Sequence, residues 1–126
     1  MVQIQSILKS NDNSGILYVK CLHILSKTKK EQAKLGDLLK ISILKKKALQ
    51  FKKQQKIFYG IVLGLKKNTR RMSGVNIKQH VNRILPLGFN FKMLGTRIYG
   101  PICKEIKLTK NYLKLKTTLK LGRGII

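Results

Sequence analysis

Apolar residues in this chain occur in short segments separated by cationic stretches, and this pattern restricts the fold more than any other feature. The longest apolar segment, Ile57 to Leu65, has nine residues, about half of what a helix needs to cross a membrane. Leu39, Ile41 and Ile43 alternate with polar residues, which is the period of a half-buried strand. A series of short strands predicts a mainly β protein with a small barrel rather than a helical bundle.

Other segments fit the same interpretation. Val2, Ile4 and Leu8 all stand at even-numbered positions, which predicts a strand that buries one face. Ile16 to Leu25 is a long apolar run with lysine and histidine interposed, and residues 76–87 hold at least one more short strand. We expect one domain over residues 1–126, with the barrel over about 1–100 and a helical part over about 101–126.

Glycine-containing segments predict tight turns. Asn11 to Gly15 is a strong turn cluster, and Gly95 to Pro101 predicts a tight, ordered loop. Gly60 and Gly64 predict bulges or sharp coiling within the longest apolar segment. The residues that we assign to tight-turn backbone are Asn13, Gly15, Gly74, Gly95, Gly100 and Pro101.

The pattern changes after Pro101. Ile102, Cys103 and Ile106 fit one short amphipathic turn, with Pro101 near the first helical position. The tail through Leu121 fits either a second short helix or a strand.

The charge of the chain is strongly one-sided. Lysine and arginine total 28 against four acidic residues, so the formal net charge is +24. Such a protein repels itself and binds polyanions, and a hydrophobic content of 43% is too high for a disordered basic tail. The partner is therefore expected to be nucleic acid or an anionic membrane. With 23 lysines and five arginines, the balance favours phosphate contact over base reading.

Cationic loops carry this charge at 27–34, 45–56 and 66–71. A merely solvated surface would intersperse both signs. If about ten phosphates are neutralised, RNA affinity should fall with salt with a log–log slope of about −7 to −9. The residues that we expect to bind RNA phosphates are Lys27, Lys29, Lys30, Lys45, Lys46, Lys47, Lys52, Lys53, Lys66, Lys67, Arg70, Arg71, Arg97 and Lys104. Two points stay open: Arg97 pairs either with a phosphate or with Glu105, and Gly95 and Gly100 serve either close RNA approach or a purely structural turn.

Few residues of the sequence could support catalysis or bind a metal ion. The four acidic residues are Asp12, Glu31, Asp37 and Glu105. Turn formation, capping and charge pairing explain them better than a paired-carboxylate site. Cys21 and His23 share one strand face and could join Cys103 and His80 as zinc ligands, but the spacing matches no recognised site. We expect free buried thiols, no cofactor and no enzyme activity.

The sequence also bears on location. The first residues lack the basic start and apolar core of a signal peptide. Alanine occurs only twice, whereas lysine, isoleucine, leucine and asparagine are abundant, as in proteins from A/T-rich genomes such as those of organelles. A cationic membrane-surface protein would need a sustained amphipathic helix, which the period of two does not favour. A free nucleic-acid-binding regulator is a second alternative.

A set of motifs, in order and spacing over essentially the whole chain, resembles the universal large-subunit ribosomal protein family numbered fourteen. The motifs are Met1-Val2-Gln3, Asp12-Asn13-Ser14-Gly15, Gly36-Asp37, Lys66-Lys67 with Arg70-Arg71 and Gly74, Asn82, Gly95-Thr96-Arg97-Ile98-Tyr99-Gly100-Pro101 and Lys104-Glu105.

The resemblance implies a five-stranded β-barrel with a protruding β-ribbon and short C-terminal helices. It also implies contacts with large-subunit rRNA, with small-subunit rRNA across an intersubunit bridge, with ribosomal proteins three and nineteen, and with a ribosome silencing factor. Because the composition is A/T-biased and the start matches that of bacterial members, we expect a mitochondrial ribosome first, then a plastid-type organelle or the bacterial cytoplasm.

The chain departs from the family in four places. Ser73-Gly74 replaces the usual Asp-Gly, and Gln79 stands where an aromatic residue is expected. The stretch 45–56 is rich in lysine and glutamine instead of glycine and proline, and residues 115–126 do not match the family ending.

Overall fold

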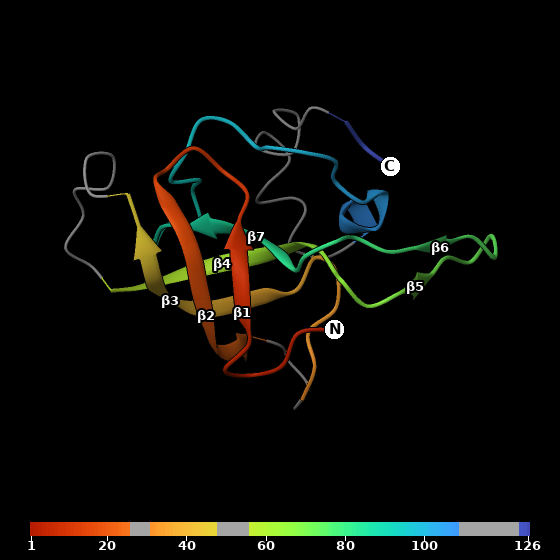
Figure 1. Ribbon diagram of the computed structural model, residues 1–126, viewed down its shortest axis with the longest axis horizontal. Coiled ribbons are helices and arrows are strands. Elements are labelled where there is room, and N and C mark those ends of the chain that lie inside the picture. Colours follow the sequence, from red (N-terminus) through yellow and green to blue (C-terminus); the bar gives the residue numbers. More distant parts are fainter. Residues whose placement is uncertain (26–30, 48–55, 109–123) are drawn as a thin grey trace.

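A closed barrel of five strands forms the body of the protein (Figure 1). The computed structural model describes residues 1–25, 31–47, 56–108 and 124–126. The barrel strands, in their order around the barrel, are β1 (Ile7–Ser10), β2 (Ile16–Leu25), β3 (Leu38–Lys46), β4 (Ile57–Gly64) and β7 (Arg83–Leu87). β1 pairs in parallel with β7, and the other neighbours are antiparallel. The predicted five-stranded barrel is confirmed.

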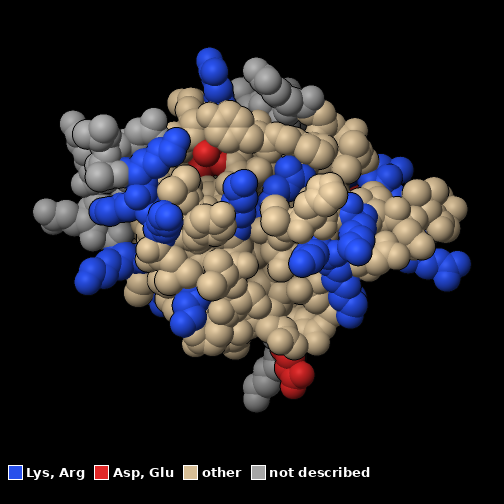
Figure 2. All heavy atoms as spheres, viewed as in Figure 1, with Lys and Arg blue, Asp and Glu red and all other residues tan. Residues whose placement is uncertain are grey.

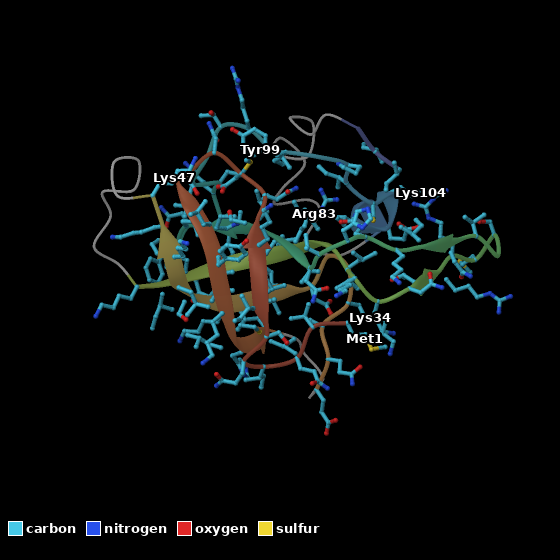
Figure 3. The ribbon with its side chains drawn as sticks, in the orientation of Figure 1. Met1, Lys34, Lys47, Arg83, Tyr99 and Lys104 are labelled. Carbon is cyan, nitrogen blue, oxygen red and sulfur yellow. The ribbon has the colours of Figure 1, made fainter. Side chains whose placement is uncertain are left out.

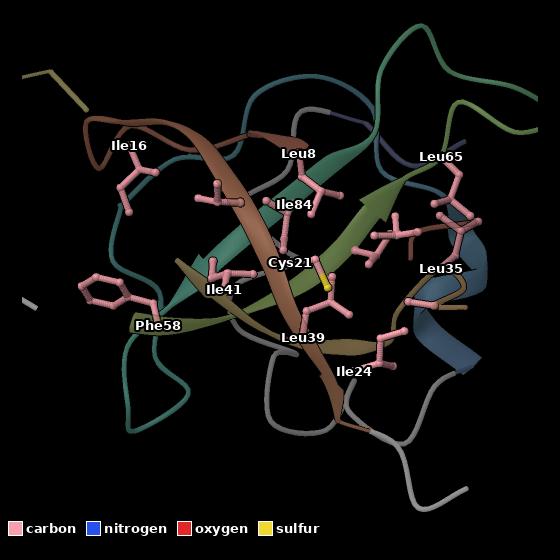
Figure 4. Close-up of a cluster of buried hydrophobic side chains, with 14 of the residues drawn as sticks. Leu8, Ile16, Cys21, Ile24, Leu35, Leu39, Ile41, Phe58, Leu65 and Ile84 are labelled. Atoms are coloured by element: carbon pink, nitrogen blue, oxygen red, sulfur yellow. The ribbon is translucent and has the colours of Figure 1, made fainter. Parts of the chain in front are cut away.

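The interior of the barrel is filled by the apolar positions that alternation predicted. Leu39 and Ile41 of β3 are fully buried, and Cys21 of β2 lies directly opposite Ile41. Leu8 and Ile84 enter the same cluster from β1 and β7 (Figure 4). Each large apolar side chain removed from water in this way contributes about 1.5–3 kcal/mol, so this cluster holds the strands together.

β4 and β7 are covered on both faces. Their outer residues, including Leu63 and Leu85, pack against Ile98, Ile102 and Ile106 in a second buried cluster. From Gly60 to Gly64 both faces of β4 are buried, so its sequence there is continuously apolar instead of alternating. The chain after β7 therefore acts as a cover for the barrel.

The glycines of β4 have different roles. The pairing of β4 with β7 shifts register between Val62 and Gly64, which confirms an irregularity at Gly64. Gly60 instead pairs in regular register with Leu39 and Pro86. A Cβ at Gly60 would lie 2.6 Å from Ile84 Cδ1, so close packing, and not a bulge, accounts for this glycine.

The N-terminal segment is not the single strand that shared parity predicted. Val2 and Leu8 are buried, but Ile4 is 47% exposed. Gln5 has a positive φ of 72°. Residues 3–6 form a turn in which the Ser6 N–H donates to the Gln3 carbonyl at 3.2 Å. This turn resets the alternation, so β1 begins only at Ile7.

The prediction that Cys21 and His23 share one face is wrong. Cys21 is buried in the barrel, whereas His23 is exposed. The β2–β3 register shifts between these two residues. A bulge adds one residue to one strand and reverses the side-chain alternation beyond it, which places the imidazole outside.

A two-stranded ribbon projects from the barrel (Figure 1), as the family resemblance implied. It consists of β5 (Thr69–Arg70) and β6 (Asn76–Ile77). Its turn contains Gly74 with a φ of 84°, and Met72 at the same turn is fully exposed.

The C-terminal part contains one short 3-10 helix, η1 (Lys104–Leu108), within the described residues. Ile102, Cys103 and Ile106 are buried as predicted. Residues 124–126 are not helical, because they form a parallel bridge with Ile102 and accept the Lys104 N–H at the Ile126 carbonyl (2.8 Å). The helical part expected over 101–126 is therefore wrong at its end, and the prediction for the tail lies mostly in 109–123, outside the described residues.

Candidate nucleic-acid interface

The exposed cations of the described chain include a set at each end of the barrel. Figure 2 shows lysine and arginine side chains at many points of the viewed face and acidic side chains at few. We call Lys45, Lys46 and Lys47, at the end of β3, the barrel-end group. We call Lys34, Lys66, Lys67 and Arg70, beside the base of the ribbon, the ribbon-root group. Figure 3 shows Lys47 and Lys34 on opposite sides of the barrel.

A turn and a loop from distant parts of the sequence meet beside the barrel-end group. The Asn13 carboxamide oxygen accepts the Thr96 N–H at 2.7 Å and the Arg97 N–H at 3.0 Å. The Asn13 amide donates to the Thr96 hydroxyl at 2.9 Å. Asn11 binds Tyr99 through backbone and side chain. The cluster at 11–15 thus fixes the loop that presents Arg97.

Gly95 is required by this contact. A Cβ there would lie 2.5 Å from Asn13 Oδ1 and 2.9 Å from Asp12 Oδ2. Contacts that short do not occur, so a side chain at position 95 would push the loop away from the turn. The contact with Asn13 and Asp12 therefore explains Gly95 as a structural turn residue.

Asp12 belongs to the framework of the turn. Its Oδ1 accepts the hydroxyls of Ser10 (2.7 Å) and Ser14 (2.8 Å), and the residue is buried. Burial raises the pKa of Asp12, and the hydrogen bonds from the two serines work in the opposite direction. Lys47 joins the same region because its N–H donates to the Gly15 carbonyl at 2.8 Å. The predicted turn role of Asp12 fits this geometry.

In the ribbon-root group, Lys66 and Lys67 lie between β4 and β5, Arg70 lies in β5, and Lys34 lies in the loop before β3. Lys66, Lys67 and Arg70 are all exposed. The Lys66 N–H donates to the Asn82 side chain at 2.8 Å. Asn82, a residue of the family motifs, therefore fixes the backbone that carries these cations.

Arg71 differs from its neighbour Arg70, because its guanidinium binds within the chain. It donates from Nε and Nη2 to the Glu105 carboxylate, and from Nη2 to the Ile126 carbonyl at 2.5 Å. The two side chains are only 15% and 25% exposed. Burial acts to raise the pKa of Glu105, but hydrogen bonds and the charge of Arg71 outweigh it, so the pKa is lowered. The partner of Glu105 is thus Arg71, not Arg97.

A family model described as Ribosomal protein L14p/L23e matches residues 1–119. The chain belongs to this family. The L14p/L23e proteins are structural proteins of the large ribosomal subunit and not an enzyme family, so this protein is a ribosomal protein that acts in translation.

This L14p/L23e protein also uses a residue that sequence reasoning missed. Arg83 opens β7 and is half-buried. Its Nε donates to Gln79 Oε1 and its Nη2 to the Pro101 carbonyl, both at 2.6 Å. Burial lowers the pKa of Arg83, although the neighbouring Cys103 acts in the opposite direction. The sequence does place an arginine at the edge of an apolar strand. Because a partly buried cation needs acceptors within the protein, this position could have indicated the role of Arg83.

Arg83 also explains Gly100 and Gln79. Gly100 has a φ of 75°, and a Cβ there would collide with Arg83 Nη1. Gln79 is buried, accepts from Arg83 and donates to Cys103 Sγ at 3.4 Å. The glutamine that departs from the family pattern thus connects β7 to the segment before η1.

Both cysteines are free and buried, as predicted. Burial raises the pKa of each thiol. Among the residues that the structure describes, no cluster of three or more His, Cys, Asp or Glu is placed to hold a metal ion. None of the helices in those residues has the length and apolarity to span a membrane.

The structure describes some of the remaining predicted site residues but not others. Lys104 is exposed at the start of η1, and Arg97 is exposed in its loop. Lys27, Lys29, Lys30, Lys52 and Lys53 lie outside the described residues.

Proposed function

We propose that this protein is a structural, non-catalytic component of the large ribosomal subunit that binds rRNA phosphates through the barrel-end group and the ribbon-root group. The observation that carries the proposal is the placement of exposed cations on hydrogen-bonded backbone at both ends of a rigid barrel. Lysine ammonium groups suit phosphate contact without base reading.

The two groups bring charge to two separate stretches of RNA. Lys47 of the barrel-end group and Lys34 of the ribbon-root group lie on opposite sides of the barrel (Figure 3). A protein with cations at both ends neutralises phosphates where RNA helices converge, and counterion release then supplies much of the affinity. The barrel contributes the fixed separation of the two groups.

The finer placement follows from the family resemblance. We infer contacts with small-subunit rRNA across an intersubunit bridge, with ribosomal proteins three and nineteen, and with a ribosome silencing factor. The A/T-biased composition supports a mitochondrial ribosome, with a plastid-type organelle or the bacterial cytoplasm as alternatives.

Sucrose-gradient sedimentation of the tagged protein from its native compartment tests the proposal. The protein should co-sediment with the large subunit and move to the top of the gradient after ribonuclease treatment. A soluble pool whose sedimentation does not change after ribonuclease treatment would support a free regulator instead. Flotation of the protein with liposomes would support a membrane-surface protein.

A further inference from the structure

A cavity of about 350 Å³ opens at the base of the ribbon, at the small end of the range for ligand pockets. We call it the ribbon-root pocket. Its lining comes from three segments of the chain: the first residue, the loop before β3 and the segment that follows β4. The lining residues are Met1, Lys34, Leu35, Leu65, Lys67, Asn68, Thr69 and Arg70.

Hydrogen bonds donated by backbone N–H groups hold the three walls in place. Val2 and Ala33 exchange N–H and carbonyl bonds at 3.0 and 2.7 Å. The Gly36 N–H donates to the Val62 carbonyl at 2.9 Å, which ties the loop to β4. On the third wall, the bond from Lys66 to Asn82 fixes the start of the segment. The cavity is therefore a built feature of the fold.

The rim of the pocket is cationic. Lys34, Lys67 and Arg70 contribute three positive charges, and the lining residues of the described chain include no carboxylate. The nearby Asp37 carboxylate accepts the Lys34 backbone N–H at 2.8 Å. Lys67 reaches across to Met1, with Nζ 3.8 Å from the thioether sulfur. Such a rim attracts a phosphate group.

The floor of the pocket is apolar. Leu35 and Leu65 belong to the barrel core and present their outer edges to the cavity, and Met1 forms part of the wall (Figure 3). A phosphate on the surface of a duplex needs only cations and no apolar recess. An unpaired nucleotide has both a phosphate and a free base face, and proteins recognise RNA mostly through such unstacked bases.

We propose that the ribbon-root pocket receives one unpaired nucleotide of an RNA strand. Lys34, Lys67 and Arg70 bind its phosphate, and its base lies against Leu35 and Leu65. The side chain of Asn68, which also lines the pocket, can hydrogen-bond to an edge of the base. This inference rests on the proposed RNA-binding function and adds a site that distinguishes bulged from fully paired RNA.

The test compares two RNA hairpins of equal length, one fully paired and one with a single bulged 4-thiouridine. The full-length protein should bind the bulged hairpin about tenfold more tightly, the size expected for one stacked or buried base. Irradiation should crosslink the thiouridine to peptides from residues 31–37 or 65–70. Equal affinities, or crosslinks confined to other peptides, would overturn the proposal.

Matched double variants separate the pocket from general charge. Lys34→Ala with Lys67→Ala should remove the preference for the bulge, whereas Lys45→Ala with Lys46→Ala should weaken both hairpins equally and keep the preference. All four lysines are exposed, so each double variant removes two surface charges, and a cooperative unfolding transition no lower than that of the unmodified protein serves as the folding control. A preference that survives the pocket variant would contradict the proposal. Equal, salt-sensitive binding of both hairpins would leave the proposed function intact, whereas loss of all salt-sensitive binding would refute that as well.

Discussion

Arg70 and Arg71 are adjacent in the sequence but have different surroundings. Arg70 is exposed on the ribbon, whereas Arg71 is held by Glu105 and the Ile126 carbonyl. An arginine whose donors already bind a carboxylate has few left for a phosphate. The two residues therefore serve different purposes, one toward RNA and one toward the attachment of the C-terminal segment.

Single substitutions should separate these purposes. Arg70→Ala should reduce the salt slope of RNA binding by about one unit and leave stability unchanged. Arg71→Ala should leave the slope nearly unchanged and destabilise the fold, because it leaves Glu105 partly buried without its partner. Binding titrations at several salt concentrations and thermal unfolding measure both effects. Equal changes in slope for the two variants would contradict the assignment.

The Arg71–Glu105 pair should also give stability a specific pH dependence. The folded-state pKa of Glu105 lies below its ordinary value of 4.5, so the pair contributes stability above about that pH. The contribution is lost as pH falls through the lower folded-state pKa. Compared with the unmodified protein, Glu105→Gln should be less stable at neutral pH by about 1 kcal/mol. The gap should close in acid, and a gap that persists there would exclude this mechanism.

At this scale the sequence predicted residue types better than residue partners. That Glu105 would take part in charge pairing followed from its cationic neighbours, but the choice of Arg71 required the contact between the ribbon and the C-terminal segment. Arg83 was missed because its acceptors, Gln79 and the Pro101 carbonyl, come together only when the chain after β7 folds over the barrel.

Among the elements, the turn at 11–15 and the loop at 95–101 behave as one unit. Asn13 alone supplies one acceptor and one donor to this contact. Gly95 permits the close approach, and Arg83 holds the far end of the loop through the Pro101 carbonyl. Motifs about eighty residues apart are thus two halves of a single structure that presents Arg97.

Asn13→Ala should loosen this unit. It removes the acceptor of the Thr96 and Arg97 amides, so the free energy of unfolding should fall by about 1–2 kcal/mol. Hydrogen exchange at Thr96 and Arg97 should accelerate more than exchange in the barrel strands. Asn90→Ala, at an exposed asparagine, is the matched control and should change neither quantity. Unchanged exchange at 96–97 in Asn13→Ala would show that other contacts hold the loop.

Strand prediction succeeded where one rule governs the whole segment. The alternation around Ile41 gave the buried face of β3, and the continuous run of β4 gave burial on both sides. It failed where local geometry resets the period: at Gln5, whose positive φ turns the chain, and between Cys21 and His23, where β2 changes register. Neither irregularity occurs at a glycine, so the sequence does not indicate its position.

For the whole molecule, the charge of +24 opposes folding by self-repulsion while the apolar clusters favour it. Predicting the barrel needed only apolar periodicity, and predicting a polyanionic partner needed only composition. Most residues of the two cationic groups were predicted from the sequence, but the placement of the groups on opposite sides of the barrel was not, because it depends on barrel closure.

Self-repulsion should make the isolated protein sensitive to ions. The midpoint of thermal unfolding should rise when salt is added from a low starting concentration, because screening weakens repulsion between exposed lysines. A short polyphosphate should raise the midpoint more at equal ionic strength, because it binds the folded surface. A midpoint indifferent to both would show that the surplus charge does not limit stability.

The most direct test of the account is the salt dependence of affinity for large-subunit rRNA. If exposed cations on both sides of the barrel neutralise about ten phosphates, a plot of log affinity against log salt should have a slope of about −7 to −9. A slope near zero, or binding that persists unchanged at high salt, would contradict the claim that rRNA phosphates balance the charge of this protein.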